Sequence, residues 1–183
     1  MFLMCAHDTH NDAGRLPIHV AARSIHRLRD LTDADALRSG DATVYSKRGY
    51  TPLHYAAAAH SVKAIEFLYR RGAHHSRISV PDAGYVSAVS KWDSLDRTGW
   101  YPIHCTATPF TYNYSADHDH AYCSLRKADM KNALSALLYT ARQGLDTQTE
   151  SGLTCAWLAA RSGCASALEV LSEMGADLTF SHR

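Results

Sequence analysis

The sequence predicts an all-α fold in which a short helix-turn-helix unit is repeated along one domain, residues 1–183. The clearest unit spans 49–75 and reads as a turn, a short helix, a second helix and a stop. Related stretches occur at 14–22, 99–104 and 152–160, and each begins with glycine. One pair of short amphipathic helices cannot bury its apolar face alone, so we expect the copies to stack on one another.

Each element of the clearest unit follows from a local signal. Thr51 suits the N-cap of the first helix, and Pro52 suits its first turn, where the missing N–H would be unpaired anyway. Gly72 suits the end of the second helix, because glycine adopts the left-handed conformation at little cost. The second helix carries apolar side chains on one face, namely Val62, Ile65, Leu68 and Tyr69.

The spacing of the copies indicates a known kind of repeat. His19 and His54 lie 35 positions apart (54 − 19), and the endings Gly72-Ala73-His74, Gly144-Leu145-Asp146 and Gly175-Ala176-Asp177 are alike. The pattern resembles the ankyrin repeat, with its period of about 33 residues and its T-P-L-H-x-A signature. The resemblance implies an ankyrin-like helix-turn-helix solenoid of about four repeats with β-hairpin-type finger loops. The repeats would cover approximately 12–45, 46–80, 96–147 and 148–180.

Two stretches exceed the repeat and are expected to be inserts. Gly72 and Gly99 lie 27 positions apart (99 − 72), whereas the ankyrin period leaves about ten. The resemblance places this insert, approximately 76–96, in an enlarged finger loop. A second insert, approximately 108–127, separates the two helices of the third repeat, and the second helix resumes near Ser124. We expect this helix to carry an apolar stripe of Met130, Leu134, Leu137, Leu138 and Ala141. Extra length in a solenoid often lies on the binding face, so both inserts are candidate specificity determinants.

The first and last repeats depart from the signature. Leu16 stands where the second copy has Thr51, which removes a helix cap worth roughly 1 kcal/mol. Cys155 replaces the proline and Trp157 the histidine of the last copy. In the ankyrin family this histidine bonds backbone groups of neighbouring loops, so Trp157 must pack differently. Residues 1–11 either cap the first repeat or are the remnant of a further repeat, and we favour the cap.

The composition is ordinary for a globular protein and names no charged partner. A net charge of +1 makes neither nucleic acid nor an anionic membrane the expected partner. No run reaches membrane-spanning length. Five cysteines show no disulfide-framework spacing, and those within repeats are expected to be buried free thiols: Cys105, Cys155 and Cys164. We expect a monomer in the cytoplasm, with the nucleus as the alternative.

No motif of phosphate binding, serine hydrolysis or zinc proteolysis occurs, so we expect no enzyme and no cofactor. One cluster, His118, His120 and Cys123, suggests a metal, because side chains two apart share a face of an extended segment. No second spaced motif supplies a fourth ligand. We therefore favour a polar surface loop, and a metal-binding enzyme or sensor is the alternative.

The end of the second repeat is locally basic, with Arg70, Arg71, His74, His75 and Arg77. The favoured interpretation is a solvated helix end whose cations complement the helix dipole. The alternative is a patch that meets an acidic partner.

The expected function is non-catalytic protein binding by an adaptor, a scaffold or a regulatory binder, with assembly of stacked copies as a further alternative. The resemblance implies that the partner is met by finger tips and inner helices, on a concave face. Those positions hold Arg, Lys, Tyr and Trp, and Arg, Tyr and Trp dominate interface hot spots: Arg15, Arg23, Lys47, Arg48, Tyr50, Arg97, Trp100 and Arg161. Tyr50 and Trp100 occupy the same place in successive repeats and could form an exposed aromatic ridge. The alternative is that each ring packs against its own finger.

Overall fold

The computed structural model describes residues 10–11, 14–33, 41–73, 99–108, 127–140 and 144–179. These ranges contain helices and no strand, which confirms the all-α class for the described part of the chain. The elements are α1 (Pro17–Ala21), α2 (Ile25–Asp33), the 3-10 turn η1 (Asp41–Thr43), α3 (Pro52–Ala58), α4 (Val62–Arg70), α5 (Pro102–Ala107), α6 (Lys127–Thr140), α7 (Cys155–Arg161) and α8 (Ala165–Glu173).

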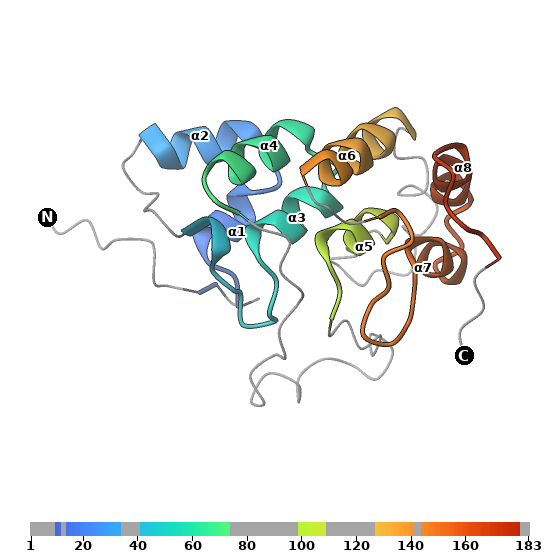
Figure 1. Cartoon of the computed structure of the whole chain (residues 1–183). Helices are drawn as coiled ribbons and strands as arrows, with labels where there is room; N and C mark the ends of the chain where they lie inside the picture. Colours follow the sequence, from blue (N-terminus) through green and yellow to red (C-terminus); the bar gives the residue numbers. More distant parts are fainter. Residues whose placement is uncertain are drawn as a thin grey trace, which may run out of the picture.

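The helices lie in two layers (Figure 1). The short helices α1, α3, α5 and α7 follow one another in the first layer, and each contacts the next. The longer helices α2, α4, α6 and α8 form the second layer in the same order, again with neighbour contacts. Helices that pair across the layers also touch, as α3 does with α4 and α7 with α8. The turns that lead into α3 and α7 extend from the first layer on the side away from the second (Figure 1).

The core lies between the two layers and follows the predicted apolar stripes. Ile65 and Leu68 of α4 are fully buried, as are Leu134 and Leu137 of α6. Small residues at contact positions, among them Ala56, Ala57, Ala64 and Ala133, are fully buried and leave room for neighbouring helices. The prediction for Tyr69 was wrong, because its side chain is 38% exposed. A tyrosine can lie at the border of a stripe because its hydroxyl reaches water while its ring covers apolar surface.

Three histidines at the same helical position tie the first layer together. Each Nδ1 accepts the backbone N–H of the residue three positions earlier, at 2.9–3.1 Å. Each Nε2 therefore carries the proton, and it donates to a backbone carbonyl of the segment that leads to the next short helix, at 2.8–3.2 Å. We call these the bridging histidines; the pairs are His19 with Val44, His54 with Trp100, and His104 with Thr147.

The helix caps depend on whether a bridging histidine is present. Thr51 occupies the N-cap of α3, as predicted, but its hydroxyl lies 2.8 Å from Nδ1 of His54 and bonds the ring rather than the helix backbone. In α7, where Trp157 replaces the histidine, the hydroxyl of Thr154 accepts the N–H of Trp157 at 3.3 Å. An ordinary side-chain cap is therefore present where the ring is missing.

Acid should weaken the fold through the bridging histidines. Burial lowers the pKa of His19 and of His104 to about 4, although hydrogen bonds to backbone groups oppose the shift. In the unfolded chain the pKa is about 6.5, so between these two values the unfolded state binds more protons. The free energy of unfolding should fall as the pH drops through this window, by about 3 kcal/mol for each ring. Urea unfolding followed by circular dichroism, at neutral pH and at pH about 4.5, measures the loss.

A His104→Gln variant provides the control for this prediction. Glutamine cannot titrate, so the variant should be less stable at neutral pH and should lose less stability on acidification. Equal losses in the variant and the native chain would show that carboxylates elsewhere cause the acid effect.

Candidate partner-binding surface

The turns before α3 and α7, which we call the finger turns, are built alike. In the first, the N–H of Ser46 donates to the carbonyl of Tyr50 and the N–H of Gly49 donates to that of Ser46, each at 2.8 Å. The hydroxyl of Ser46 also accepts the N–H of Tyr50 at 3.1 Å. The same pattern recurs around Thr149 and Gly152 in the second. Both finger turns are thus held by their own hydrogen bonds, and the described residues in them form no strand.

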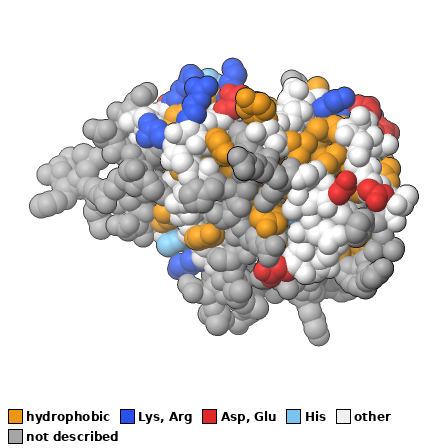
Figure 2. Space-filling model, in the orientation of Figure 1, with side chains coloured by type: hydrophobic (Ala, Val, Ile, Leu, Met, Phe, Trp, Pro, Cys, Tyr) orange, Lys and Arg blue, Asp and Glu red, His pale blue; other side chains and the backbone are white. Residues whose placement is uncertain are grey.

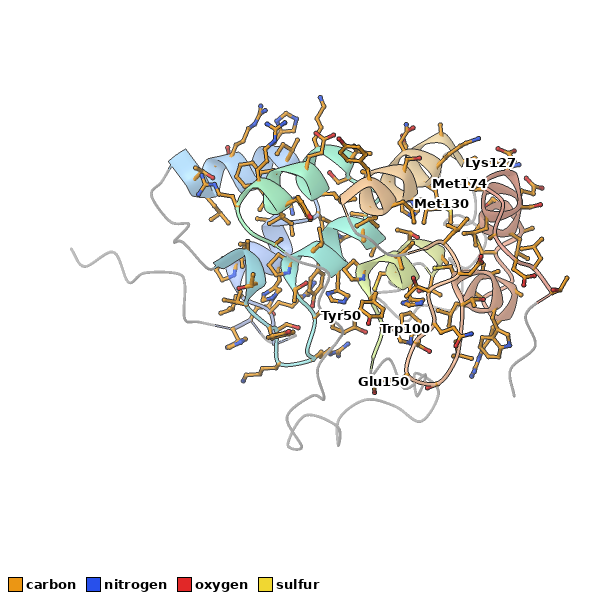
Figure 3. All side chains as sticks on the ribbon, in the orientation of Figure 1. Tyr50, Trp100, Lys127, Met130, Glu150 and Met174 are labelled. Atoms are coloured by element: carbon orange, nitrogen blue, oxygen red, sulfur yellow. The ribbon has the colours of Figure 1, made fainter. Side chains whose placement is uncertain are left out.

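Each finger turn rests on a glycine of the preceding unit. The backbone of Lys47 donates to the carbonyl of Gly14 at 2.8 Å, and a Cβ on Gly14 would lie 2.7 Å from Cβ of Lys47. Gly99 has the same relation to Glu150, since its added Cβ would lie 2.5 Å from the Glu150 Cγ. Figure 3 shows Glu150 at the tip of its turn, on the side of the first layer away from the second layer. At both glycines a side chain would meet the side chain of the turn that follows, so the close stacking of turn on turn requires glycine.

The predicted exposed aromatic ridge is wrong. Tyr50 is 5% exposed and Trp100 is 1% exposed, and both lie on the finger-turn side of the first layer (Figure 3). The residue after the turn glycine points inward onto the bridging histidine of its own unit. The ring centroids are 5.8 Å apart for Tyr50 and His54, and 6.3 Å apart for Trp100 and His104. In the last unit the same position holds Leu153, which is also buried. An aliphatic residue at this position was the signal in the sequence that the position belongs to the core.

Comparison with known proteins supports this reading of the repeated unit. Residues 48–80 match the family model described as ankyrin repeat. The chain contains an ankyrin repeat. A comparison with curated proteins finds no match. The matched segment includes α3, His54, α4 and Gly72, which is the unit that the sequence singled out, and the resemblance is confirmed for this ankyrin repeat.

The other predicted contact residues are all basic and differ in exposure. Arg23, Lys47 and Arg161 are exposed, whereas Arg15 and Arg48 are half-buried. Lys47 and Arg48 belong to the finger turn that enters the matched ankyrin repeat, and Lys47 lies against the segment of Arg15. Arg23 and Arg161 lie at the ends of α1 and α7, away from the finger turns. Arg97 lies outside the described residues.

In the last unit Trp157 occupies the position of the bridging histidine and makes different contacts. Trp157 is half-buried, and the guanidinium of Arg161 lies 5.3 Å from the centre of its ring. A cation over an indole face is a favourable electrostatic contact. The substitution has thus replaced a hydrogen bond to a neighbouring loop by a contact within α7, in agreement with the expectation that Trp157 packs differently.

The cysteines of the described residues lie in the interior. Cys105, Cys155 and Cys164 are buried and free, as predicted. Burial raises the pKa of the Cys155 thiol far above its usual value, and its Sγ donates to the carbonyl of Ile103 at 3.4 Å. A protonated thiol is a poor nucleophile. No metal-ligand cluster occurs within the described ranges.

The features expected of the two inserts remain predictions. The proposed metal ligands His118, His120 and Cys123 lie outside the described residues, as do 76–96 and nearly all of 108–127. No helix in the described part of the chain is long and apolar enough to cross a membrane.

One exposed aromatic residue on the second layer was not predicted from the sequence. Tyr139, near the end of α6, is 93% exposed, whereas Leu137 two positions earlier is fully buried. Its offset from the buried stripe of α6 was the available signal.

Gly99 should tolerate substitution less well than Gly152. Both have a positive φ, +76° and +77°, so alanine at either position costs about 1–2 kcal/mol of backbone strain. Only at Gly99 does the added methyl meet Glu150, whereas nothing lies within 4 Å of it at Gly152. Thermal unfolding should therefore show a larger loss for Gly99→Ala than for Gly152→Ala. Equal losses would mean that the turns do not rest on one another as described.

Trp100→Ala should destabilise the fold, because the ring belongs to the core. Loss of a buried tryptophan costs about 3–5 kcal/mol, whereas Arg161→Ala at an exposed position should cost less than about 1 kcal/mol. Chemical unfolding of the two variants measures the difference. A Trp100→Ala variant as stable as the native chain would restore this ring as a surface residue.

Proposed function

We propose that the chain is a non-catalytic protein-binding module, built as a solenoid of about four ankyrin-like repeats. The match of residues 48–80 to the ankyrin repeat carries this proposal, because ankyrin repeats generally mediate protein–protein interaction. Two further observations support the extension of the repeat beyond the matched segment. A bridging histidine occurs in three units, and a finger turn rests on a glycine in two places.

The proposed partner surface consists of the finger turns and the short helices of the first layer, up to the C-terminal ends of these helices. Its exposed members are Arg23, Lys47 and Arg161, with Arg15 and Arg48 half-buried beside them and Arg97 retained as a prediction. Tyr50 and Trp100 do not belong to this surface, because their rings are buried beneath it. Because the finger turns are held by their own hydrogen bonds, a partner would order few new groups on binding, which favours affinity.

The two inserts are proposed to choose among partners, since extra length in a repeat array usually lies on its binding face. The cytoplasm is proposed as the location, because three buried free thiols suit a reducing compartment. We also propose that the protein is a monomer.

An affinity capture tests the proposed function. The tagged chain is used to capture proteins from a lysate of cells that make it, and bound proteins are identified by mass spectrometry. A Lys47→Ala/Arg161→Ala variant should lose at least about tenfold of the captured partner, because Arg at an interface centre is a common hot spot. Asn132→Asp/Ser135→Asp, on the exposed face of α6, changes the net charge equally and should retain the partner.

Circular dichroism first confirms that both variants are folded. A partner retained by both would move the contact surface away from the finger turns and short helices. Failure of the native chain to enrich any protein over the tag alone would contradict the binding function itself.

A further inference from the structure

The second layer carries an excess of positive charge at one end. Helices α2 and α4, with Arg71 at the end of α4, present five exposed Lys and Arg side chains: Arg27, Arg29, Lys63, Arg70 and Arg71. The same stretches contain three acidic residues, Asp30, Asp33 and Glu66, so the balance is 5 − 3 = +2. This local excess of positive charge is larger than the net charge of +1 of the whole chain. Figure 2 shows the Lys and Arg side chains gathered over α2 and α4. We call this surface the basic outer face.

The other end of the same layer neutralises its own charge. Lys127 pairs with Glu169, and Lys131 pairs with Glu173 at 3.1 Å, so two parallel ion pairs join α6 to α8. Figure 3 shows Lys127 on the outer side of α6, next to α8. By contrast, no carboxylate of the described residues forms an ion pair with Arg27, Arg29, Lys63 or Arg70. The lysines of α6 are thus neutralised by carboxylates of α8, whereas these four cations of α2 and α4 are not paired with a described carboxylate.

Helix stability does not explain the cations of the basic outer face. Arg27 lies in the first turn of α2 and Lys63 in the first turn of α4, and neither first turn contains an acidic residue. The N-terminal end of a helix is the positive end of its dipole, where a cation is unfavourable. Arg70, in the last turn of α4, and Arg71, its C-cap, are placed where a cation stabilises the helix. Arg27 and Lys63 therefore have a cost in the free protein, which a bound anion would offset.

We propose that the basic outer face docks an acidic segment of a partner protein. The proposal rests on the proposed protein-binding function and adds to it a second surface and the chemistry of the partner. Charge complementarity speeds encounter and fixes the register of such a segment. Tyr69, 38% exposed beside Arg70, and Arg71, whose guanidinium lies 5.3 Å from the centre of the Phe67 ring, supply the residue types that are enriched at contact centres.

A protein segment fits this surface better than a nucleic acid does. Asp30 and Glu66 are exposed among the cations and would repel the continuous negative charge of a phosphate backbone. A peptide can leave neutral residues opposite these two carboxylates and place its own acids elsewhere. The small net charge of the whole chain also gives weak long-range attraction for a polyanion.

Binding of a fluorescent peptide, followed by anisotropy at low and at physiological ionic strength, tests the inference. The peptide alternates short runs of Glu and Asp with single leucines, and an uncharged Gln/Asn version is its control. An Arg27→Glu/Lys63→Glu variant should bind the acidic peptide about tenfold more weakly than the native chain does. This variant places acids in both first turns, so it should unfold at the same temperature as the native chain or at a higher one.

The matched control is Lys47→Glu/Arg161→Glu, which makes the same two kinds of substitution on the proposed partner surface of the first layer. It should bind the acidic peptide within about twofold of the native value. Absence of peptide binding at low ionic strength, or a larger loss in the control than in the test variant, would overturn the inference. Tighter binding of an oligonucleotide of equal charge would also overturn it, in favour of nucleic acid. A protein captured through Lys47 and Arg161 would in each case leave the proposed function standing.

Discussion

The spacing of the short helices depends on a neutral histidine ring that uses both of its nitrogens. In three units Nδ1 accepts from the backbone at the start of its own helix, and Nε2–H donates to the segment that enters the next. Only one tautomer of the neutral ring satisfies both bonds, and protonation destroys the acceptor. The packing of Tyr50 and Trp100 over these rings, and the contact of turn on glycine, both require the position that the ring sets.

Most of the helical framework could be predicted from the sequence, because it follows from local signals. The helix pair α3 and α4 was marked by Thr51, Pro52 and Gly72, and the stripe of α6 by Leu134 and Leu137. The errors concern aromatic residues. Tyr50, Trp100 and Tyr69 are amphipathic side chains that suit both core and surface, so their burial depends on the fold around them and not on their type.

The candidate contact surface was only partly predictable, for a related reason. Repeat register placed Lys47 and Arg161 at exposed positions, and the structure agrees. The repeat register could not show which cations would be paired, because the carboxylates that pair with Lys127 and Lys131 belong to a later helix, α8. Glu173, for example, lies 42 positions after Lys131 along the chain. The difference between the self-compensated and the basic end of the second layer therefore emerges only when α6 packs against α8.

The histidine bridges also determine how freely the chain can change in length. The bonds of His19 and His54 close loops of 25 and 46 residues, yet both are made with the same atoms and nearly the same geometry. Closing a loop twice as long costs only about 0.6 kcal/mol more in chain entropy. A segment inserted between two units is therefore almost neutral for folding as long as the ring still reaches its carbonyl. Selection can then lengthen, shorten or rewrite such a segment while the layers behind it stay unchanged, which uncouples the evolution of specificity from that of stability.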